Sequence, residues 1–112
     1  MSEPRLKSGI WVQAHARRCM IEGAAATVAR RGDEDAGDIL LKLNNLSGGF
    51  QVLARAFRGD GKRIWMRATG NDWTPEADAN AAIARRIARD PDLWVLEIED
   101  RQGRHFLDDP VE

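Results

Sequence analysis

Cysteine is nearly absent from this sequence of 112 residues, which contains only Cys19. A single thiol excludes an internal disulfide and any zinc site built from cysteines. The first residues lack the apolar core of a secretory signal, and no stretch is long and apolar enough to span a bilayer. We therefore expect a cytoplasmic protein without a membrane partner.

A net charge is also nearly absent, because 17 Lys and Arg residues are matched by 18 Asp and Glu residues. Proteins that bind nucleic acids usually carry excess positive charge, since neutralising phosphates supplies much of their affinity. We expect no nucleic-acid partner, although weak binding through a basic patch stays an alternative. The content of 43% hydrophobic and 31% charged residues predicts a single folded domain over residues 1–112, with loose termini at 1–7 and 108–112.

Signatures of common catalytic and metal sites are missing as well. The sequence contains no glycine-rich phosphate loop, no Gly-x-Ser-x-Gly elbow and no zinc spacing. Its densest carboxylates, Asp33, Glu34, Asp35 and Asp38, start like a calcium loop but lack the glycine and the bidentate glutamate that complete one. We interpret this segment as a solvated turn and expect no metal, no cofactor and no assignable catalytic residue.

The first predicted element is a helix over residues 8–22, with Ser8 as its N-cap and Gly23 as its stop. A short strand over residues 10–16 is the alternative, because apolar residues also alternate there. Three apolar residues at helical spacing, flanked by Trp11 and Met20, form the expected buried stripe of the helix: Ile10, Ala14 and Ile21.

Alternating apolar residues predict the strands. They cover residues 24–31, with Ala26 and Val28 facing in, and residues 38–44, 50–58, 62–68 and 93–98. A second helix is expected from Thr74, its cap, to about Arg89, and residues 104–107 can return as an edge strand that pairs Phe106 with Ile98. The fold class is therefore α+β: a largely antiparallel sheet of four to six strands with two helices on one face, in the order α-β-β-β-β-α-β-β.

The register of the central hairpin follows from its loop. Three residues, 59–61, join residues 50–58 to residues 62–68, with Gly61 in the left-handed position. This loop places Ala56 opposite Ile64 and Ala54 opposite Met66, so one face of the pair is apolar. A loop shorter by one residue would mix charge into that face.

The other face of this hairpin is the candidate interaction surface. It carries Arg55, Phe57, Arg63, Trp65 and Arg67. An exposed tryptophan with flanking arginines is typical of protein-interaction hot spots, whereas the ordinary alternative is a solvated face with local ion pairs. We therefore predict a non-enzymatic module that binds an unknown protein or a second copy of itself, so that a homodimer is one outcome.

A small enzyme is the alternative, with a site at one of two histidines. His15 and Cys19 lie four residues apart on one face of the first predicted helix, which suits a thiol–imidazole pair. His105 would lie near Glu97, Glu99 and Asp100 if the last hairpin forms. Each set also has an ordinary explanation, a buried small cysteine in the first case and a cross-strand charge pair in the second.

Four stretches together resemble a small bacterial family catalogued only as a domain of unknown function, DUF1491. They are residues 6–14, residues 30–37 with the strand at 38–43, residues 90–100 and residues 103–107. The Asp-Pro-Asp-Leu-Trp sequence at residues 90–94 is the most specific part. The resemblance covers nearly the whole chain and implies a free-standing bacterial domain, but it brings no known activity or site residues.

Overall fold

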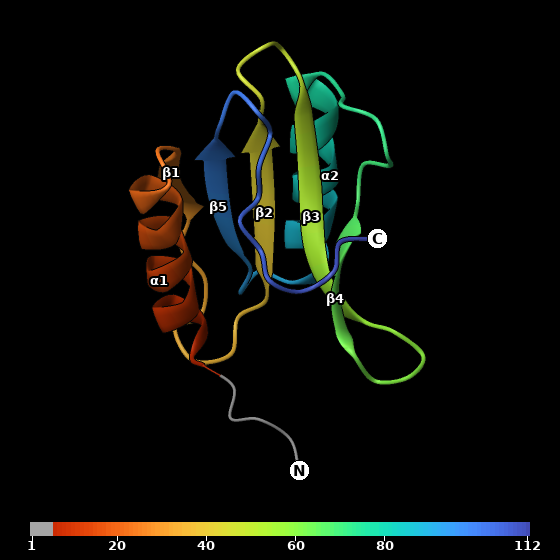
Figure 1. The fold of residues 1–112 in the computed structure, drawn as a ribbon. Coiled ribbons are helices and arrows are strands. Elements are labelled where there is room, and N and C mark those ends of the chain that lie inside the picture. The colour runs from red at the N-terminus through yellow and green to blue at the C-terminus, as the bar shows by residue number, and fades with distance from the viewer. Residues whose placement is uncertain (1–5) are drawn as a thin grey trace.

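The computed structural model describes residues 6–112, in which five strands form one mixed sheet with a helix on each face (Figure 1). Most of the predicted leader at 1–7 therefore lies outside the described residues. The elements are α1 (Ser8–Ile21), β1 (Ala25–Arg30), β2 (Ile39–Asn44), β3 (Phe50–Phe57), β4 (Arg63–Arg67), α2 (Glu76–Arg89) and β5 (Trp94–Glu99). The predicted α+β class is confirmed.

The sheet has the strand order β1-β5-β2-β3-β4. Three of its four strand pairs are antiparallel, but β5 runs parallel to β2. The reason lies in the connection through α2, which takes the chain from the β4 edge over one face of the sheet and back to its centre. The last strand in the sequence is therefore a central one.

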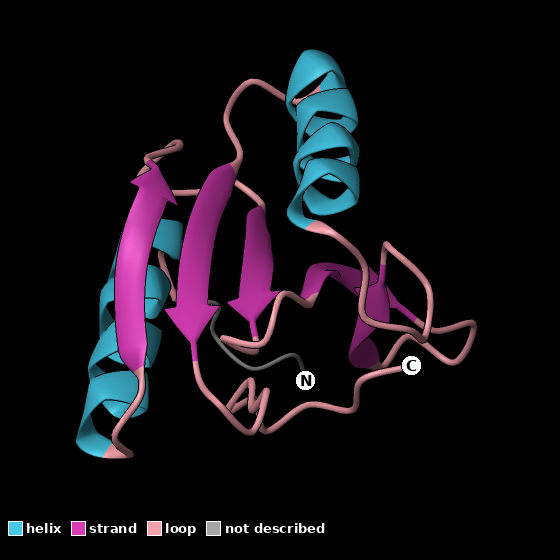
Figure 2. Ribbon diagram, turned by 90° about the horizontal axis from the view of Figure 1, so that it is seen from above, coloured by secondary structure: helices cyan, strands magenta, loops and turns pink. Residues whose placement is uncertain are grey.

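The helices cover opposite faces of the sheet, and our expectation of one shared face is wrong (Figure 2). Val12 and Cys19 of α1 pack in the same cluster as Leu41, whereas Ile83 of α2 packs in a second cluster with Leu40. The physical cause is β2, whose leucines point alternately to both faces and are all buried. A strand with apolar side chains on both sides needs cover on both sides.

The helix predicted for residues 8–22 is confirmed as α1, and the alternative strand is not formed. Gly23 has a φ of +93° and ends the helix as expected. The prediction of Ser8 as N-cap is wrong, because Lys7 is the cap residue and Ser8 is the first helical residue. The Ser8 hydroxyl instead donates a hydrogen bond to the Gly37 carbonyl, which ties the helix to the turn before β2.

The buried stripe of α1 also differs from the predicted one. Val12, His15 and Cys19 are buried, whereas Ile10 and Ile21 are 52% and 74% exposed. Both sets have helical spacing, so periodicity alone could not choose between them. Backbone hydrogen bonds from the start of α1 to residues 34 and 35 contribute to holding Val12 toward the sheet.

The hairpin register is confirmed. Ala56 lies opposite Ile64 and Ala54 opposite Met66, and Gly61 has a φ of +83°. Ile64 is buried on the α2 face, but Met66 is 49% exposed because β4 is an edge strand of the sheet. On β1, at the opposite edge, Val28 is likewise 40% exposed, although we expected it to face in.

The cap of the second helix lies one residue after the expected one, and the helix ends where we predicted. Pro75 is the cap residue of α2, and the Thr74 hydroxyl donates to the Phe50 carbonyl instead. The helix ends at Arg89. No helix among residues 6–112 has the length and apolar character that a membrane crossing requires.

The segment after β5 does not form the predicted strand over residues 104–107. That expectation is wrong because β1 occupies the free side of β5, with Ala26 paired to Ile98. The segment crosses the α1 face of the sheet instead and reaches β4 (Figure 1). There the Trp65 amide donates to the Pro110 carbonyl, and the Glu112 amide donates to the Trp65 carbonyl. Residues 108–112, for which we expected a loose tail, thus lie along the edge of the sheet.

Candidate functional site

Trp65, the centre of the predicted interaction surface, is buried in the structure with 1% of its surface exposed. Its ring lies 5.6 Å from that of Trp11 on α1, measured between centroids, and Leu107 and Val111 pack against the same cluster. The expectation that Trp65 faces away from the interior is therefore wrong. The α1 face of the hairpin is not left open, because α1 and the segment after β5 cover much of it.

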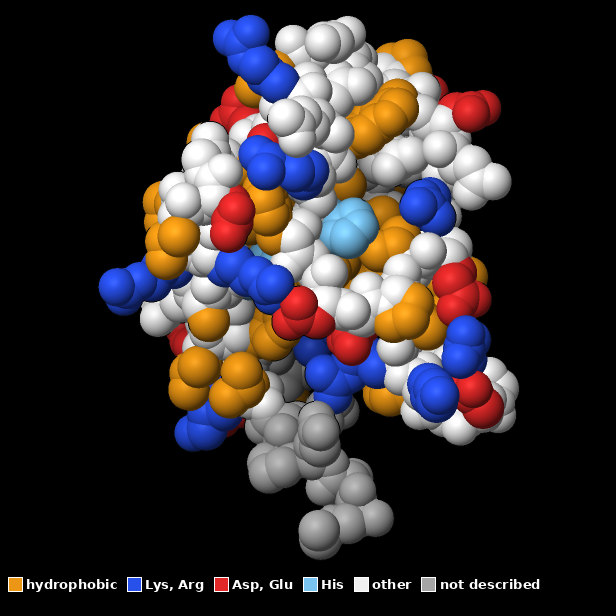
Figure 3. Space-filling view, viewed as in Figure 1, with side chains coloured by type: hydrophobic (Ala, Val, Ile, Leu, Met, Phe, Trp, Pro, Cys, Tyr) orange, Lys and Arg blue, Asp and Glu red, His pale blue; other side chains and the backbone are white. Residues whose placement is uncertain are grey.

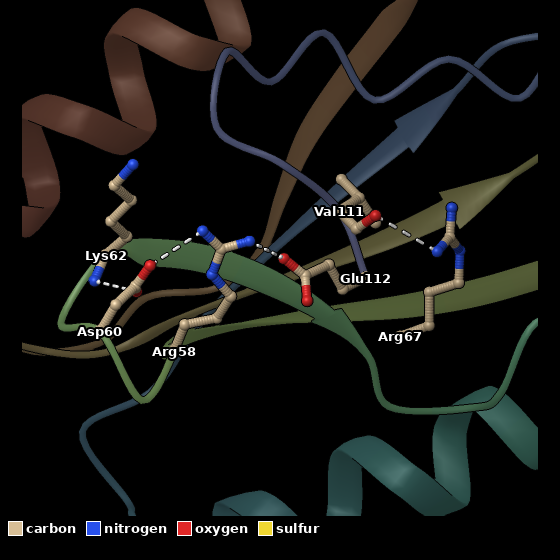
Figure 4. A network of polar contacts seen from close by, with 6 residues as sticks. All are labelled: Arg58, Asp60, Lys62, Arg67, Val111 and Glu112. Atoms are coloured by element: carbon tan, nitrogen blue, oxygen red, sulfur yellow. Dashed lines mark hydrogen bonds and ion pairs between the residues drawn. The ribbon is translucent and has the colours of Figure 1, made fainter.

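The other four residues of the predicted surface differ from one another in exposure and in the groups that they contact. Phe57 is 63% exposed, and its partner across the hairpin, Arg63, is half-buried. The Arg55 side chain is 12% exposed and lies 3.4 Å from the carboxylate of Asp38. Arg67 is held by the last residues of the chain, since its guanidinium donates to the Val111 carbonyl (Figure 4).

A small charge network fixes the far end of the hairpin. The Arg58 guanidinium lies between two carboxylates, 3.1 Å from Asp60 and 3.0 Å from Glu112 (Figure 4). The Lys62 amide donates to Asp60, and this hydrogen bond, with the Arg58 side chain next, lowers the pKa of Asp60. The loop and the last residue of the chain are thus connected through one arginine.

Two hollows open beside Arg55 and Arg63. The first, which we call the α1 cleft, has a volume of about 310 Å³ and lies between α1, the hairpin and the segment after β5. Its lining includes Trp11, His15, Arg63, Leu107 and Asp109. The second, the tip cleft, has a volume of about 350 Å³ and includes Asp38, Phe57 and Arg63 in its lining. Arg55 and Arg63 line both hollows and therefore form the wall between them.

The charges on this side of the molecule are mixed rather than of one sign. Arg18 makes a bidentate pair with Asp108, at 2.9 and 2.8 Å. Lys and Arg side chains are interspersed with Asp and Glu over the visible face (Figure 3). Because cations do not gather alone on this face, it lacks the basic patch that nucleic-acid binding needs.

His15 is a buried residue of the α1 cleft lining. Its Nε2 lies 2.8 Å from the His105 carbonyl oxygen, and because a carbonyl only accepts, Nε2 carries the proton. The ring stacks on Trp11 with a centroid distance of 4.7 Å. Burial lowers the pKa of His15, partly opposed by the hydrogen bond to His105. The imidazole is therefore neutral at pH 7, with Nδ1 as its acceptor.

Cys19 does not form the thiol–imidazole pair that the sequence suggested. Its side chain is fully buried, and burial raises the pKa of the thiol to about 11. No hydrogen bond joins Cys19 to His15 in the part of the chain that the structure describes. Because only the thiolate is a good nucleophile, a thiol with this pKa is unsuited to attack at neutral pH.

The structure does not assemble the predicted set around His105 either. Glu97 points to the α2 face, where its carboxylate lies 3.6 Å from Lys42 Nζ. His105 lies on the α1 face, and its Nδ1 accepts a hydrogen bond from the Leu107 amide. Burial, with a smaller contribution from Arg67, lowers the pKa of His105. An acid–base pair with Glu97 is therefore not formed.

In the acidic turn before β2, a side chain caps backbone amides of the same turn. Asp33 accepts hydrogen bonds from the amides of Asp35 and Ala36, and Glu34 pairs with Arg31 at 2.6 Å. Within residues 6–112, no three His, Cys, Asp or Glu side chains are placed to hold a metal ion. The interpretation of this segment as a capped turn is confirmed by these hydrogen bonds.

Sequence reasoning missed the α1 cleft. It is formed by Trp11 and His15 from α1, Arg63 from β4, and Leu107 and Asp109 from the last segment. The spacing of Trp11 and His15, four residues apart, is the only local signal, because it places both rings on one side of a helix. Asp109 joins them through a tertiary contact of a segment without periodicity, so no pattern could have placed it.

Comparison with known proteins identifies relatives of this chain but no activity. The family model DUF1491, described as a protein of unknown function, matches residues 6–108. The crystal structure of a DUF1491 protein from Caulobacter crescentus is similar, with a TM-score of 0.87, 48% identity, and coverage of 96% of this chain and 100% of the other. A search of curated proteins found no match.

Two solution structures extend the comparison. The NMR structure of a DUF1491 protein from Caulobacter crescentus has a TM-score of 0.84 and 46% identity, and covers 98% of this chain and 99% of the other. The protein Atu0922 from A. tumefaciens has a TM-score of 0.71 and 30% identity, with 86% coverage of both chains. The resemblance inferred from the four sequence stretches is therefore confirmed.

Proposed function

Because this chain belongs to the DUF1491 family, whose function is unknown, we propose its function from its own surface: a non-enzymatic module that binds a protein partner through the tip of the β3–β4 hairpin. The contact surface, which we call the tip surface, consists of Arg55, Phe57 and Arg63. The partner is a second copy of the chain or another protein. We place the module in the bacterial cytoplasm, because its one cysteine, Cys19, is a free thiol.

The exposure of Phe57 is the observation that carries this proposal. A phenylalanine with 63% of its surface in water costs free energy that contact with a partner would recover. Arg63 lies directly opposite it and makes no hydrogen bond or ion pair within the described residues. An aromatic ring next to an available guanidinium, at the rim of a hollow, has the composition of an interaction hot spot.

The two alternatives have less support. An enzyme at His15 and Cys19 would need a thiolate, and the pKa of the Cys19 thiol is raised to about 11. Binding of nucleic acid through the arginines would need excess positive charge, but Arg55 pairs with Asp38 and Arg18 pairs with Asp108.

The test is site-specific photo-crosslinking in cells from position 57, with position 46 as the matched control. Leu46 is also an exposed hydrophobic residue, at 49%, but it lies in the turn between β2 and β3, at the other end of the sheet. We expect one product of defined mass from position 57 and none from position 46. Mass spectrometry of that product distinguishes a second copy from another protein.

Arg63→Ala in the same background should reduce the yield of the crosslink, because the guanidinium contributes to the same contact. The proposal fails if positions 57 and 46 give the same products, or if neither gives any. Sedimentation velocity of the wild type and of Phe57→Ala then tests the homodimer. A wild type that stays monomeric at high concentration removes self-association and leaves only a different protein as the partner.

A further inference from the structure

The α1 cleft contains two opposite charges that the fold does not use. Arg63 and Asp109 both line it, and neither makes a hydrogen bond or an ion pair with any residue from 6 to 112. The other charged residues of the lining are already engaged, Arg18 with Asp108 and Arg55 with Asp38. The unused charges of the cleft therefore sum to zero, with one cation and one anion left over.

This balance restricts what the cleft can bind. A simple anion would satisfy Arg63 but would bring another negative charge near Asp109 and Asp108. A simple cation would satisfy Asp109 but would bring another positive charge near Arg18. A ligand that neutralises both unused charges must itself carry both signs of charge. A guanidinium binds a carboxylate in a fork of two hydrogen bonds, and a carboxylate accepts from an ammonium group.

The remaining lining suits the rest of such a ligand. His15 offers Nδ1 as an acceptor, since Nε2 donates to the His105 carbonyl. No described buried side-chain nitrogen or oxygen lacks a partner, so Nδ1, which makes no hydrogen bond among residues 6–112, keeps some contact with solvent although His15 is only 6% exposed. Trp11 and Leu107 provide apolar surface in the same cleft. A volume of about 310 Å³ is at the lower end of the range for small-molecule sites.

We propose that the α1 cleft binds a small dipolar molecule with an ammonium and a carboxylate group, of which a free α-amino acid with an apolar side chain is the simplest. Arg63 holds the carboxylate, Asp109 accepts from the ammonium group, and the side chain lies against Trp11 and Leu107. This site shares Arg63 with the proposed protein contact, but Phe57 lies outside its lining, so crosslinking from position 57 and leucine binding test the two proposals separately. Either proposal can fail without the other.

The test is an NMR titration of the full chain with L-leucine, N-acetyl-L-leucine and L-leucinamide as probes. The second probe lacks the ammonium charge and the third lacks the carboxylate. The indole N–H of Trp11 reports on the cleft, and that of Trp94 is the internal reference, because it is bonded to the Asp33 carbonyl at 2.7 Å outside the lining. We expect saturable shifts at Trp11 with leucine, and binding about tenfold or more weaker for each derivative, since each loses a hydrogen-bonded charge.

Two variants and two controls assign the effect to the cleft. Arg63→Gln and Asp109→Asn should each weaken leucine binding about tenfold or more, whereas Arg101→Gln and Asp72→Asn, at exposed positions outside the lining, should leave it unchanged. An unshifted Trp94 signal shows that each variant is folded. The proposal is overturned if leucine does not saturate, if N-acetyl-leucine or leucinamide binds as well as leucine, or if the controls lose binding equally.

Discussion

Trp65 connects three parts of the molecule that are distant in the sequence. Its ring packs near Trp11 of α1 and within the same cluster as Leu107. Its backbone amide donates a hydrogen bond to the Pro110 carbonyl, and its backbone carbonyl accepts one from the Glu112 amide. A side chain that we expected at the surface is therefore among the most buried in the structure, and it contributes to stability rather than to partner contact.

Replacing Trp65 with alanine should lower the free energy of unfolding by about 3–5 kcal/mol, because the change leaves a large cavity between α1 and the sheet. Phe57→Ala is the matched control on the same hairpin. Its ring is 63% exposed, so we expect a change within about 0.5 kcal/mol. Urea unfolding followed by far-UV circular dichroism measures both. Equal losses for the two variants would contradict the burial of Trp65.

His15 should make stability depend on pH. Burial holds its pKa in the folded state below the ordinary value of 6.5, so the unfolded chain takes up a proton first as the pH falls. The stabilisation is therefore complete above pH 6.5 and is lost as the pH falls through the folded-state pKa. His105, whose pKa is also lowered, adds to this dependence.

His15→Gln should flatten part of the pH dependence, because glutamine can donate an amide hydrogen bond but does not titrate. We would measure the free energy of unfolding from pH 8 to pH 5 for the wild type and the variant. The wild type should lose more stability over this interval than His15→Gln does. If the two curves run parallel, His15 does not have the lowered pKa that its burial implies.

At the scale of elements, the loop between β3 and β4 requires a left-handed backbone conformation at one of its residues. Gly61 has a φ of +83°, whereas Gly59, two residues earlier in the same loop, has no positive φ. Space does not distinguish the two glycines, because a Cβ at either position would have nothing within 4 Å. Only the backbone conformation differs.

Gly61→Ala should therefore cost about 1 kcal/mol, because alanine is strained in the left-handed region. Gly59→Ala should be neutral or slightly stabilising, since it reduces the freedom of the unfolded chain. Thermal unfolding of both variants under identical conditions separates these outcomes. A larger loss at Gly59 than at Gly61 would contradict the loop conformation.

The elements that could be predicted from the sequence are those whose cause is local. The hairpin register depends on a three-residue loop and on alternation along two adjacent strands, and both are visible in residues 50–68. The ends of α1 and α2 depend on Gly23 and Pro91, which act on their immediate neighbours.

The features that could not be predicted depend on distant partners. Which stripe of α1 is buried is set in part by hydrogen bonds to residues 34 and 35, and β5 pairs with β1 rather than with residues 104–107. The burial of Trp65 and the α1 cleft follow from the same cause, a final segment without periodicity that crosses the sheet. Local patterns contain no information about where such a segment goes.

For the whole molecule, the decisive feature is that the sheet separates two hydrophobic clusters. Leu41 belongs to the cluster under α1, and Leu40, the preceding residue of β2, belongs to the cluster under α2. Both leucines are fully buried. Consecutive residues of one central strand contribute to both clusters. Unfolding of either cluster would therefore disrupt the packing of β2 and with it the other cluster. We therefore expect the two layers to unfold together.

Leu40→Ala and Leu41→Ala should each lower the free energy of unfolding by about 2–5 kcal/mol. In both variants, tryptophan fluorescence and far-UV circular dichroism should give the same midpoint. Fluorescence reports mainly on the α1 side, where Trp11, Trp65 and Trp94 lie, whereas dichroism reports on both helices. If Leu40→Ala moved the dichroism midpoint and left the fluorescence midpoint in place, the α2 layer would be an independent unit and β2 would not couple the two.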